Sequence, residues 1–135
     1  MLSVVAALIL NDGKILACQR ARGQRFELQW EFPGGKREEG ETLEEALARE
    51  LQEELGVEAR IGAEVHRLQH QYANIGVPFE IIFFVASAPA EKIRNLEFER
   101  IEWREPHTLP DLNFLEADRD LVKKLASGEI HLPAL

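Results

Sequence analysis

Residues 30–57 read WEFPGGKREEGETLEEALARELQEELGV, and this stretch predicts a glycine loop followed by a highly charged helix. Thr42 is a suitable N-cap, and Glu45 stands three residues later, as in a capping box. Gly56 is a natural stop, because glycine readily adopts the left-handed conformation that ends helices. We therefore expect a helix from Thr42 to Leu55.

The carboxylates of this helix fall in one sector of its surface. At about 100° per residue, Glu50, Glu53 and Glu54 lie next to one another and border the apolar stripe of Leu47, Leu51 and Leu55. A solvated face is the ordinary explanation of a charge run, but it does not require this convergence. Like charges so close together are unfavourable without a cation, and oxygen ligands favour Mg²⁺, with Mn²⁺ as a substitute.

The loop before the helix fits the same purpose. Gly34 and Gly35 permit backbone torsions that other residues resist, so a main-chain carbonyl can approach a metal or a phosphate closely. A glycine pair alone is weak evidence. Its place directly before an acidic helix strengthens the prediction of a phosphate and metal site.

Outside this stretch the chain alternates strands with helices. Val4–Leu10 and Lys14–Arg20 are expected to form a hairpin, and Trp30–Phe32 a short strand. The other expected elements are strands at Arg60–Tyr72, Val77–Ala86 (central, because it is almost continuously apolar) and Glu99–Arg104, and an amphipathic helix at Leu115–Leu125. This order predicts a single domain over residues 1–135, of the α/β or α+β class, with a sheet covered on both faces.

Charge and cysteine content indicate which partners and which cellular location to expect. A net charge of −8 disfavours a nucleic-acid polymer as partner, and a bound divalent metal would let an acidic site accept a phosphorylated substrate. The single cysteine, Cys18, forms no intrachain disulfide and is expected in the core. Val4–Leu10 is too short to span a membrane and lacks a preceding basic segment. We expect a cytoplasmic protein with no membrane partner.

The motif from Gly35 through Glu41 to residues 49–57, RELQEELGV, resembles a complete Nudix box. Weaker similarity to the MutT-like branch, the (deoxy)nucleoside triphosphate pyrophosphohydrolases, extends over nearly the whole chain. The resemblance implies an α/β/α sandwich with a mixed β-sheet between helices. It also implies hydrolysis of a nucleoside diphosphate linked to another moiety.

The resemblance also assigns roles within the box. Glu50, Glu53 and Glu54 become metal-binding carboxylates, and the Gly35 carbonyl becomes a further ligand. Arg49 and Glu41 orient these carboxylates through a salt bridge, and Gly56 is a structural member of the box.

A later glutamate is expected to join the metal site and the catalysis. The family places it six residues before a tryptophan, and Glu97 stands at that distance from Trp103. Glu99 and Glu102 are the neighbouring alternatives. Glu53 and Glu97 both remain candidates for the general base that accepts the proton of the attacking water.

The substrate pocket is assigned by the same resemblance. Phe32 is expected to stack on a base or to be a core aromatic, and Asn113 to read a base edge or to cap a helix. Arg20, Gln19 and Lys36 are further substrate-binding candidates.

The chain departs from members that select oxidised purines. It has Gln19 where they carry arginine, and Val77 replaces a second basic residue. Tyr72 lies near the position of a stacking tyrosine in dinucleoside-polyphosphate hydrolases.

The expected reaction is Mg²⁺-dependent hydrolysis of a (deoxy)nucleoside triphosphate to the monophosphate and pyrophosphate. Damaged nucleotides such as 8-oxo-dGTP are among the candidate substrates. The alternatives are another Nudix substrate, such as a dinucleoside polyphosphate or a nucleotide sugar, and a non-catalytic nucleotide-binding module. The oligomeric state stays open, with a homodimer as one alternative.

Overall fold

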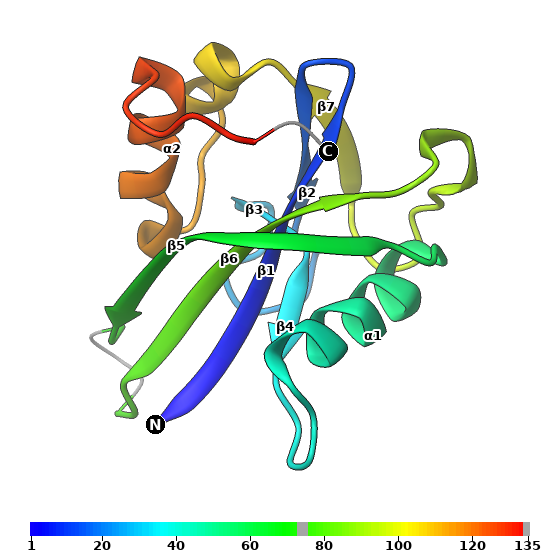
Figure 1. Cartoon of the computed structure of the whole chain (residues 1–135). Helices are drawn as coiled ribbons and strands as arrows, with labels where there is room; N and C mark the ends of the chain where they lie inside the picture. Colours follow the sequence, from blue (N-terminus) through cyan, green and yellow to red (C-terminus); the bar gives the residue numbers. More distant parts are fainter. Residues whose placement is uncertain (73–75, 134–135) are drawn as a thin grey trace.

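The computed structural model describes residues 1–72 and 76–133, and within them seven strands form a mixed sheet that two α-helices cover (Figure 1). The strands are β1 (Leu2–Asn11), β2 (Lys14–Gln19), β3 (Trp30–Glu31), β4 (Gly34–Lys36), β5 (Arg60–His70), β6 (Phe79–Ser87) and β7 (Arg100–Arg104). The helices are α1 (Leu43–Leu55) and α2 (Arg119–Ser127), and short 3₁₀ turns lie at Ala90–Lys92, Pro106–Asp111 and Glu116–Asp118. The mixed sheet between helices confirms the expected fold class.

Strands β1 and β6 lie inside the sheet, whose order is β3-β2-β1-β6-β5. They pair in parallel from Leu2↔Phe79 to Ile9↔Ala86, whereas the other pairs of strands are antiparallel. The internal position expected for the second apolar run is therefore confirmed. Its continuous hydrophobicity follows from burial of both faces.

The core alternates along the strands with a period of two. In β1, Val5, Ala7 and Ile9 face the cluster under α1, whereas Ala6 and Leu8 face the cluster under α2. Strand β6 alternates in the same way. The two helices therefore cover opposite faces of the sheet (Figure 1).

The β1–β2 hairpin opens beyond its turn. Asp12 and Gly13 both have positive φ, 53° and 78°, as a two-residue hairpin turn requires. The two strands pair only at Leu10↔Ile15 and Asn11↔Lys14. Further from the turn, β4 pairs with Val4–Ala6 in place of β2. A cavity opens where the two strands separate.

Strand β4 shows why two glycines precede α1. A Cβ atom on Gly34 would lie 1.9 Å from the carbonyl oxygen of Val5, so only glycine allows this approach. The glycines expected as a loop are thus part of a short strand bonded to β1.

Helix α1 is confirmed at both ends. The Thr42 hydroxyl accepts a hydrogen bond from the Glu45 amide at 3.0 Å, and the Glu45 carboxylate accepts one from the Thr42 amide at 2.8 Å. Gly56 has φ 61°, and its amide donates to the Gln52 carbonyl at 3.0 Å.

The expectation for the second helix was wrong at its start. Helix α2 begins at Arg119, and Leu115 precedes a 3₁₀ turn instead. The Leu115 amide donates to the Trp30 carbonyl at 2.9 Å, and Phe114 bridges Trp30 in parallel. These bonds to β3 hold the segment extended and delay the helix. In the described ranges, no helix is long and apolar enough to cross a membrane.

We predict that Thr42→Ala lowers the free energy of unfolding by about 1 kcal/mol, because one backbone amide loses its side-chain acceptor. Thr42→Ser retains the hydroxyl and is expected to unfold like the wild type. Urea denaturation of both variants measures the difference. Equal stability of Thr42→Ala and the wild type would contradict the role of the cap.

Candidate functional site

A cavity of about 420 Å³ opens where β1 and β2 separate. Its lining includes Gly35, Glu50, Glu54 and Glu97 from the α1 side of the sheet. Its other lining residues include Phe26, Tyr72, Leu115, Ala117 and Asp118, of which the last three belong to the approach to α2. One acidic end and one mainly apolar end therefore share a single cavity.

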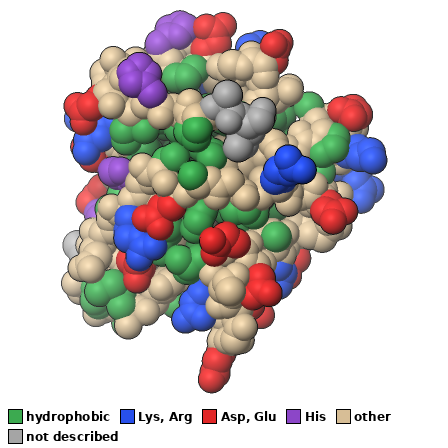
Figure 2. Space-filling model, in the orientation of Figure 1, with side chains coloured by type: hydrophobic (Ala, Val, Ile, Leu, Met, Phe, Trp, Pro, Cys, Tyr) green, Lys and Arg blue, Asp and Glu red, His purple; other side chains and the backbone are tan. Residues whose placement is uncertain are grey.

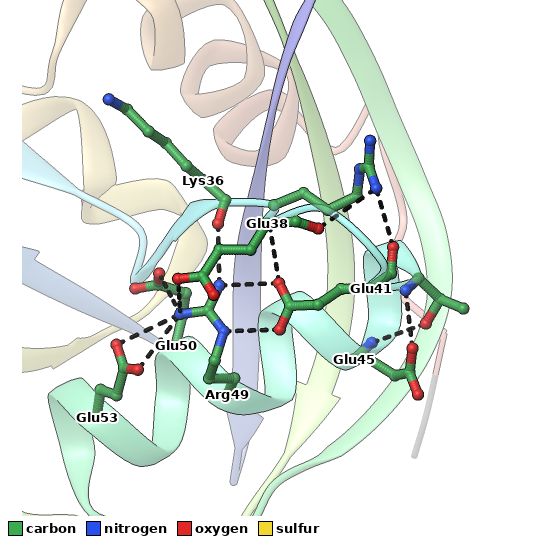
Figure 3. Close-up of polar contacts among 9 residues, drawn as sticks. Lys36, Glu38, Glu41, Glu45, Arg49, Glu50 and Glu53 are labelled. Atoms are coloured by element: carbon green, nitrogen blue, oxygen red, sulfur yellow. Dashed lines mark hydrogen bonds and ion pairs between the residues drawn. The ribbon is translucent and has the colours of Figure 1, made fainter.

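Arg49 connects the acidic residues of the site (Figure 3). Its guanidinium donates to both carboxylate oxygens of Glu41, at 2.7 and 3.0 Å, and to the Lys36 carbonyl at 3.0 Å. A further bond of 3.0 Å reaches Glu50. The bonds to Glu41 are the main cause of the raised pKa of Arg49 and of the lowered pKa of Glu41. The ion pair expected between Arg49 and Glu41 is thus present.

Glu53 lies outside the cavity lining. Its side chain is 58% exposed and accepts bonds from Arg49 at 3.3 and 3.4 Å. The expectation that all three helix carboxylates border the core is therefore wrong for Glu53. The helix turns it away from the leucine stripe, and Arg49 holds it at the rim.

Glu54 is buried against the glycine strand. Its residue is 7% exposed, and its carboxylate accepts a bond of 3.1 Å from the Gly34 amide. A Cβ atom on the adjacent Gly35 would lie 2.5 Å from the carboxyl carbon of Glu50. The two glycines thus make room for the two carboxylates.

Burial and mutual repulsion raise the pKa values of these acids. Burial, followed by the charge and a hydrogen bond of the neighbouring Glu97, raises the pKa of Glu54 to about 10. Burial also raises the pKa of Glu50, although Arg49 opposes it. A cation would relieve this repulsion and favour the ionised acids.

The donor set fits a hard divalent cation. Glu50, Glu54 and Glu97 offer carboxylate oxygens along one cavity, and Gly35 offers a backbone carbonyl. Within the described ranges, no three acidic, histidine or cysteine side chains already converge on one metal-sized point.

Basic side chains lie along the same cavity. Arg20, Arg25 and Lys36 line it, and Arg20 donates to Glu31 at 3.1 Å and to the Arg25 carbonyl at 2.7 Å. Gln19 lies outside the lining and donates to the Leu28 carbonyl at 3.0 Å. Figure 2 shows basic and acidic side chains side by side on the face viewed, with acidic ones at the tip of the protruding β4–α1 loop.

The structure separates the two residues expected to bind a base. Phe32 lines the cavity, but its ring is buried against Phe83 and Phe114, with centroids 6.3 and 5.1 Å away. Asn113 is exposed and lines a different hollow, next to Arg119. It caps no helix either, because Leu115 and Asp118 occupy the N-cap positions. The arrangement gives Asn113 no access to the cavity.

Sequence reasoning missed two acids, the half-buried Glu31 and the buried Asp118. Both line the cavity. Burial raises the pKa of Glu31 to about 7, and burial with the charge of Glu31 raises that of Asp118. The sequence offered one signal for Glu31, its place between Trp30 and Phe32 in a short strand. It offered none for Asp118, which resembles a surface residue of an amphipathic helix.

The sequence of this chain is similar to those of known proteins. Residues 1–125 match the family model described as NUDIX domain. The chain is 36% identical over 127 residues to the 8-oxo-dGTP diphosphatase of Haemophilus influenzae, across 93% of this chain and 91% of that protein. It is 49% identical over 74 residues to the CTP pyrophosphohydrolase of Escherichia coli, across 55% of each chain.

Solved structures show the same similarity. The E. coli ORF135 protein superposes with a TM-score of 0.77 and 33% identity, across 100% of this chain and 95% of that one. A MutT NUDIX hydrolase from Burkholderia pseudomallei gives a TM-score of 0.77 and 28% identity, across 90% and 95% of the two chains.

We predict that the metal-free protein loses stability as pH rises from about 7 to about 9. The folded state keeps the Glu54 proton up to a pKa of about 10, whereas the unfolded chain releases it near 4.5. The folded state therefore binds more protons in this window, and a rise in pH favours unfolding. Chemical denaturation in EDTA measures the slope. Glu54→Gln cannot ionise and should flatten it, and an equally steep slope in that variant would refute the assignment.

Proposed function

This chain belongs to the NUDIX domain family, and we propose that it hydrolyses (deoxy)nucleoside triphosphates with Mg²⁺ to a nucleoside monophosphate and pyrophosphate. The observation that carries this proposal is the cavity in which Glu50, Glu54 and Glu97 lie next to the basic Arg20 and Lys36. Acids that hold a cation and basic groups that attract phosphates are both required for phosphoanhydride hydrolysis.

Each residue of the acidic end has a proposed part. Glu50, Glu54, Glu97 and the Gly35 carbonyl would hold the cation, and Arg49 would position Glu50 through the contacts described above. When bound, Mg²⁺ supplies charge neutralisation for the phosphates and makes water more acidic. Mn²⁺ is expected to substitute, because it accepts the same oxygen ligands.

The proposed general base is Glu97, because it lines the cavity whereas Glu53 does not. Its carboxylate would accept a proton from water as the water oxygen attacks phosphorus in line. The new P–O bond forms as the bond to pyrophosphate breaks, and the leaving oxygen takes the released charge. Glu53 then acts through Arg49, at the rim of the site.

Relatives favour a triphosphate over the other Nudix substrates. The protein of H. influenzae is named for 8-oxo-dGTP, that of E. coli for CTP, and others are named nucleoside triphosphatase. Gln19 stands where members that select oxidised purines carry arginine, and its side chain already donates to a backbone carbonyl. We therefore propose both ordinary and oxidised triphosphates as substrates to be tested. Free nucleotides also make the cytoplasm the proposed place of action.

The base would occupy the apolar end of the cavity. Phe26 and Tyr72 line this end, and their ring centroids are 4.8 Å apart. Asp118 is 5% exposed, and in the described chain its side chain makes no capping bond to α2. A neutral carboxyl group has one donor and two acceptor sites, as a base edge requires. We therefore propose that Asp118 reads the base, in place of Asn113.

The function is tested with a panel of nucleotides that includes CTP, dGTP and 8-oxo-dGTP. We predict hydrolysis that requires Mg²⁺, stops in excess EDTA and releases pyrophosphate. Chromatography of the nucleotide product and an assay for pyrophosphate follow the reaction. Release of orthophosphate, or undiminished activity in EDTA, would contradict the proposal.

Two variants of helix α1 test the proposed metal site. Glu54→Gln should lower kcat at least ~100-fold, as expected for loss of a metal ligand. Glu44→Gln is the matched control, because Glu44 is exposed in the first turn of the same helix. An equal loss of kcat in both variants would show that the side of α1 assigned to the cavity is wrong.

We predict that Asp118→Ala raises KM for the preferred nucleotide roughly tenfold, because a lost buried hydrogen bond costs about 1–3 kcal/mol. Asp118→Asn keeps a donor and an acceptor and should retain most of the affinity. The kcat of both variants should change little, since the acidic end is unaltered. Steady-state kinetics on a purine and a pyrimidine triphosphate measure both constants, and an unchanged KM in Asp118→Ala would exclude base recognition by this residue.

A further inference from the structure

The connection between β6 and β7 is fastened to α1 just before it reaches Glu97. The Arg94 amide donates to the Leu55 carbonyl at 2.9 Å, and the Leu96 amide donates to the Glu54 carbonyl at 3.0 Å. Carbonyls in the last turn of a helix have no partner within the helix. These two bonds therefore give two carbonyls at the end of α1 a partner. They also fix the position of the connection relative to the helix that carries Glu54.

Asn95 forms a tight turn around Glu97. Its side-chain oxygen accepts hydrogen bonds from the Phe98 amide at 2.8 Å and from the Glu97 amide at 3.3 Å. Its side-chain nitrogen donates to the Phe98 carbonyl at 2.8 Å. One carboxamide thus binds three backbone groups, which needs both the donor and the acceptor that asparagine provides.

The chain is anchored again directly after this turn. The Glu99 amide donates to the Gln19 carbonyl of β2 at 2.9 Å, and Phe98 lines the cavity. Glu97 itself is exposed as a residue and lies outside any helix or strand. Its side chain nevertheless lines the cavity together with the buried Glu54. The turn at Asn95 accounts for this orientation.

We infer that Asn95 is a positioning residue, whose carboxamide holds the backbone of Glu97 so that the Glu97 carboxylate faces Glu54 in the cavity. The inference rests on the proposed function, in which Glu97 takes part in hydrolysis. Asn95 does not line the cavity and touches neither the proposed substrate nor its metal. Its effect must therefore pass through Glu97.

The first test compares Asn95→Ala with two other variants. Asn95→Ala should lower kcat ~10-fold or more, the usual loss when a group that orients a metal ligand is removed. KM for the nucleotide should change little, because the base end is distant. Asn95→Asp keeps the oxygen that accepts from the Glu97 and Phe98 amides but loses the donor, and it should recover part of kcat. Leu96→Ala is the matched control, since it trims an exposed side chain in the same turn and keeps the backbone bond to α1.

The second test is a double-mutant cycle with Glu97→Gln, read by kcat and by Mn²⁺ binding in a spin-resonance titration of the protein with the metal alone. If Asn95 acts through Glu97, Asn95→Ala should cause no further loss in the Glu97→Gln protein. A fall in kcat or in Mn²⁺ affinity that disappears in that background supports the inference. An additive loss, or no loss of either quantity in Asn95→Ala, overturns it.

Failure of the proposed function can be distinguished from failure of this inference. If the wild-type chain hydrolyses no nucleoside triphosphate with Mg²⁺, the proposed function is wrong. The Mn²⁺ titration then decides the role of Asn95 by itself, because it requires no turnover. Thermal melting of each variant checks that the exposed Asn95 is not needed for folding.

Discussion

The bidentate ion pair between Arg49 and Glu41 joins α1 to the loop before it, and the rest of the acidic end depends on this contact. The same guanidinium reaches Glu50, Glu53 and the Lys36 carbonyl. One planar cation with fixed donor directions can satisfy these partners at once, which a lysine could not do. It keeps repelling carboxylates close together and fixes where each one points.

The site combines opposite electrostatic requirements. Its acids have raised pKa values because burial and mutual repulsion disfavour their charged forms. A triphosphate adds further negative charge to the cavity. A cation between the phosphates and the acidic side chains would relieve the repulsion between them. The basic residues Arg20 and Lys36 along the cavity contribute to this balance, although Arg20 is already paired with Glu31. A bound metal would therefore help a chain with a net charge of −8 to accept a phosphorylated substrate.

The separation of β1 from β2 provides the space for this chemistry. A fully paired hairpin would close the region that β4 and β3 now border. The cavity consequently receives side chains from both faces of the sheet, with acids near α1 and the proposed base site near α2. A mutation at the acidic end therefore leaves the side chains of the proposed base site in place, and the reverse also holds. This division explains why kcat and KM are expected to respond to different residues.

The sequence by itself determined the elements whose cause is local. The capping box of Thr42 and Glu45, the Asp12–Gly13 turn and the spacing of Glu50 and Glu54 depend on residues a few positions apart, so their patterns predict them. Only the tertiary structure decided which side chains enter the cavity. Asp118 lies there, and Asn113 does not, because hydrogen bonds to Trp30 hold the preceding segment extended. Glu97 lines the cavity beside Glu54 because Arg94 and Leu96 bind the end of a helix about forty positions earlier. Such contacts join segments that are remote in sequence, and no local pattern encodes them.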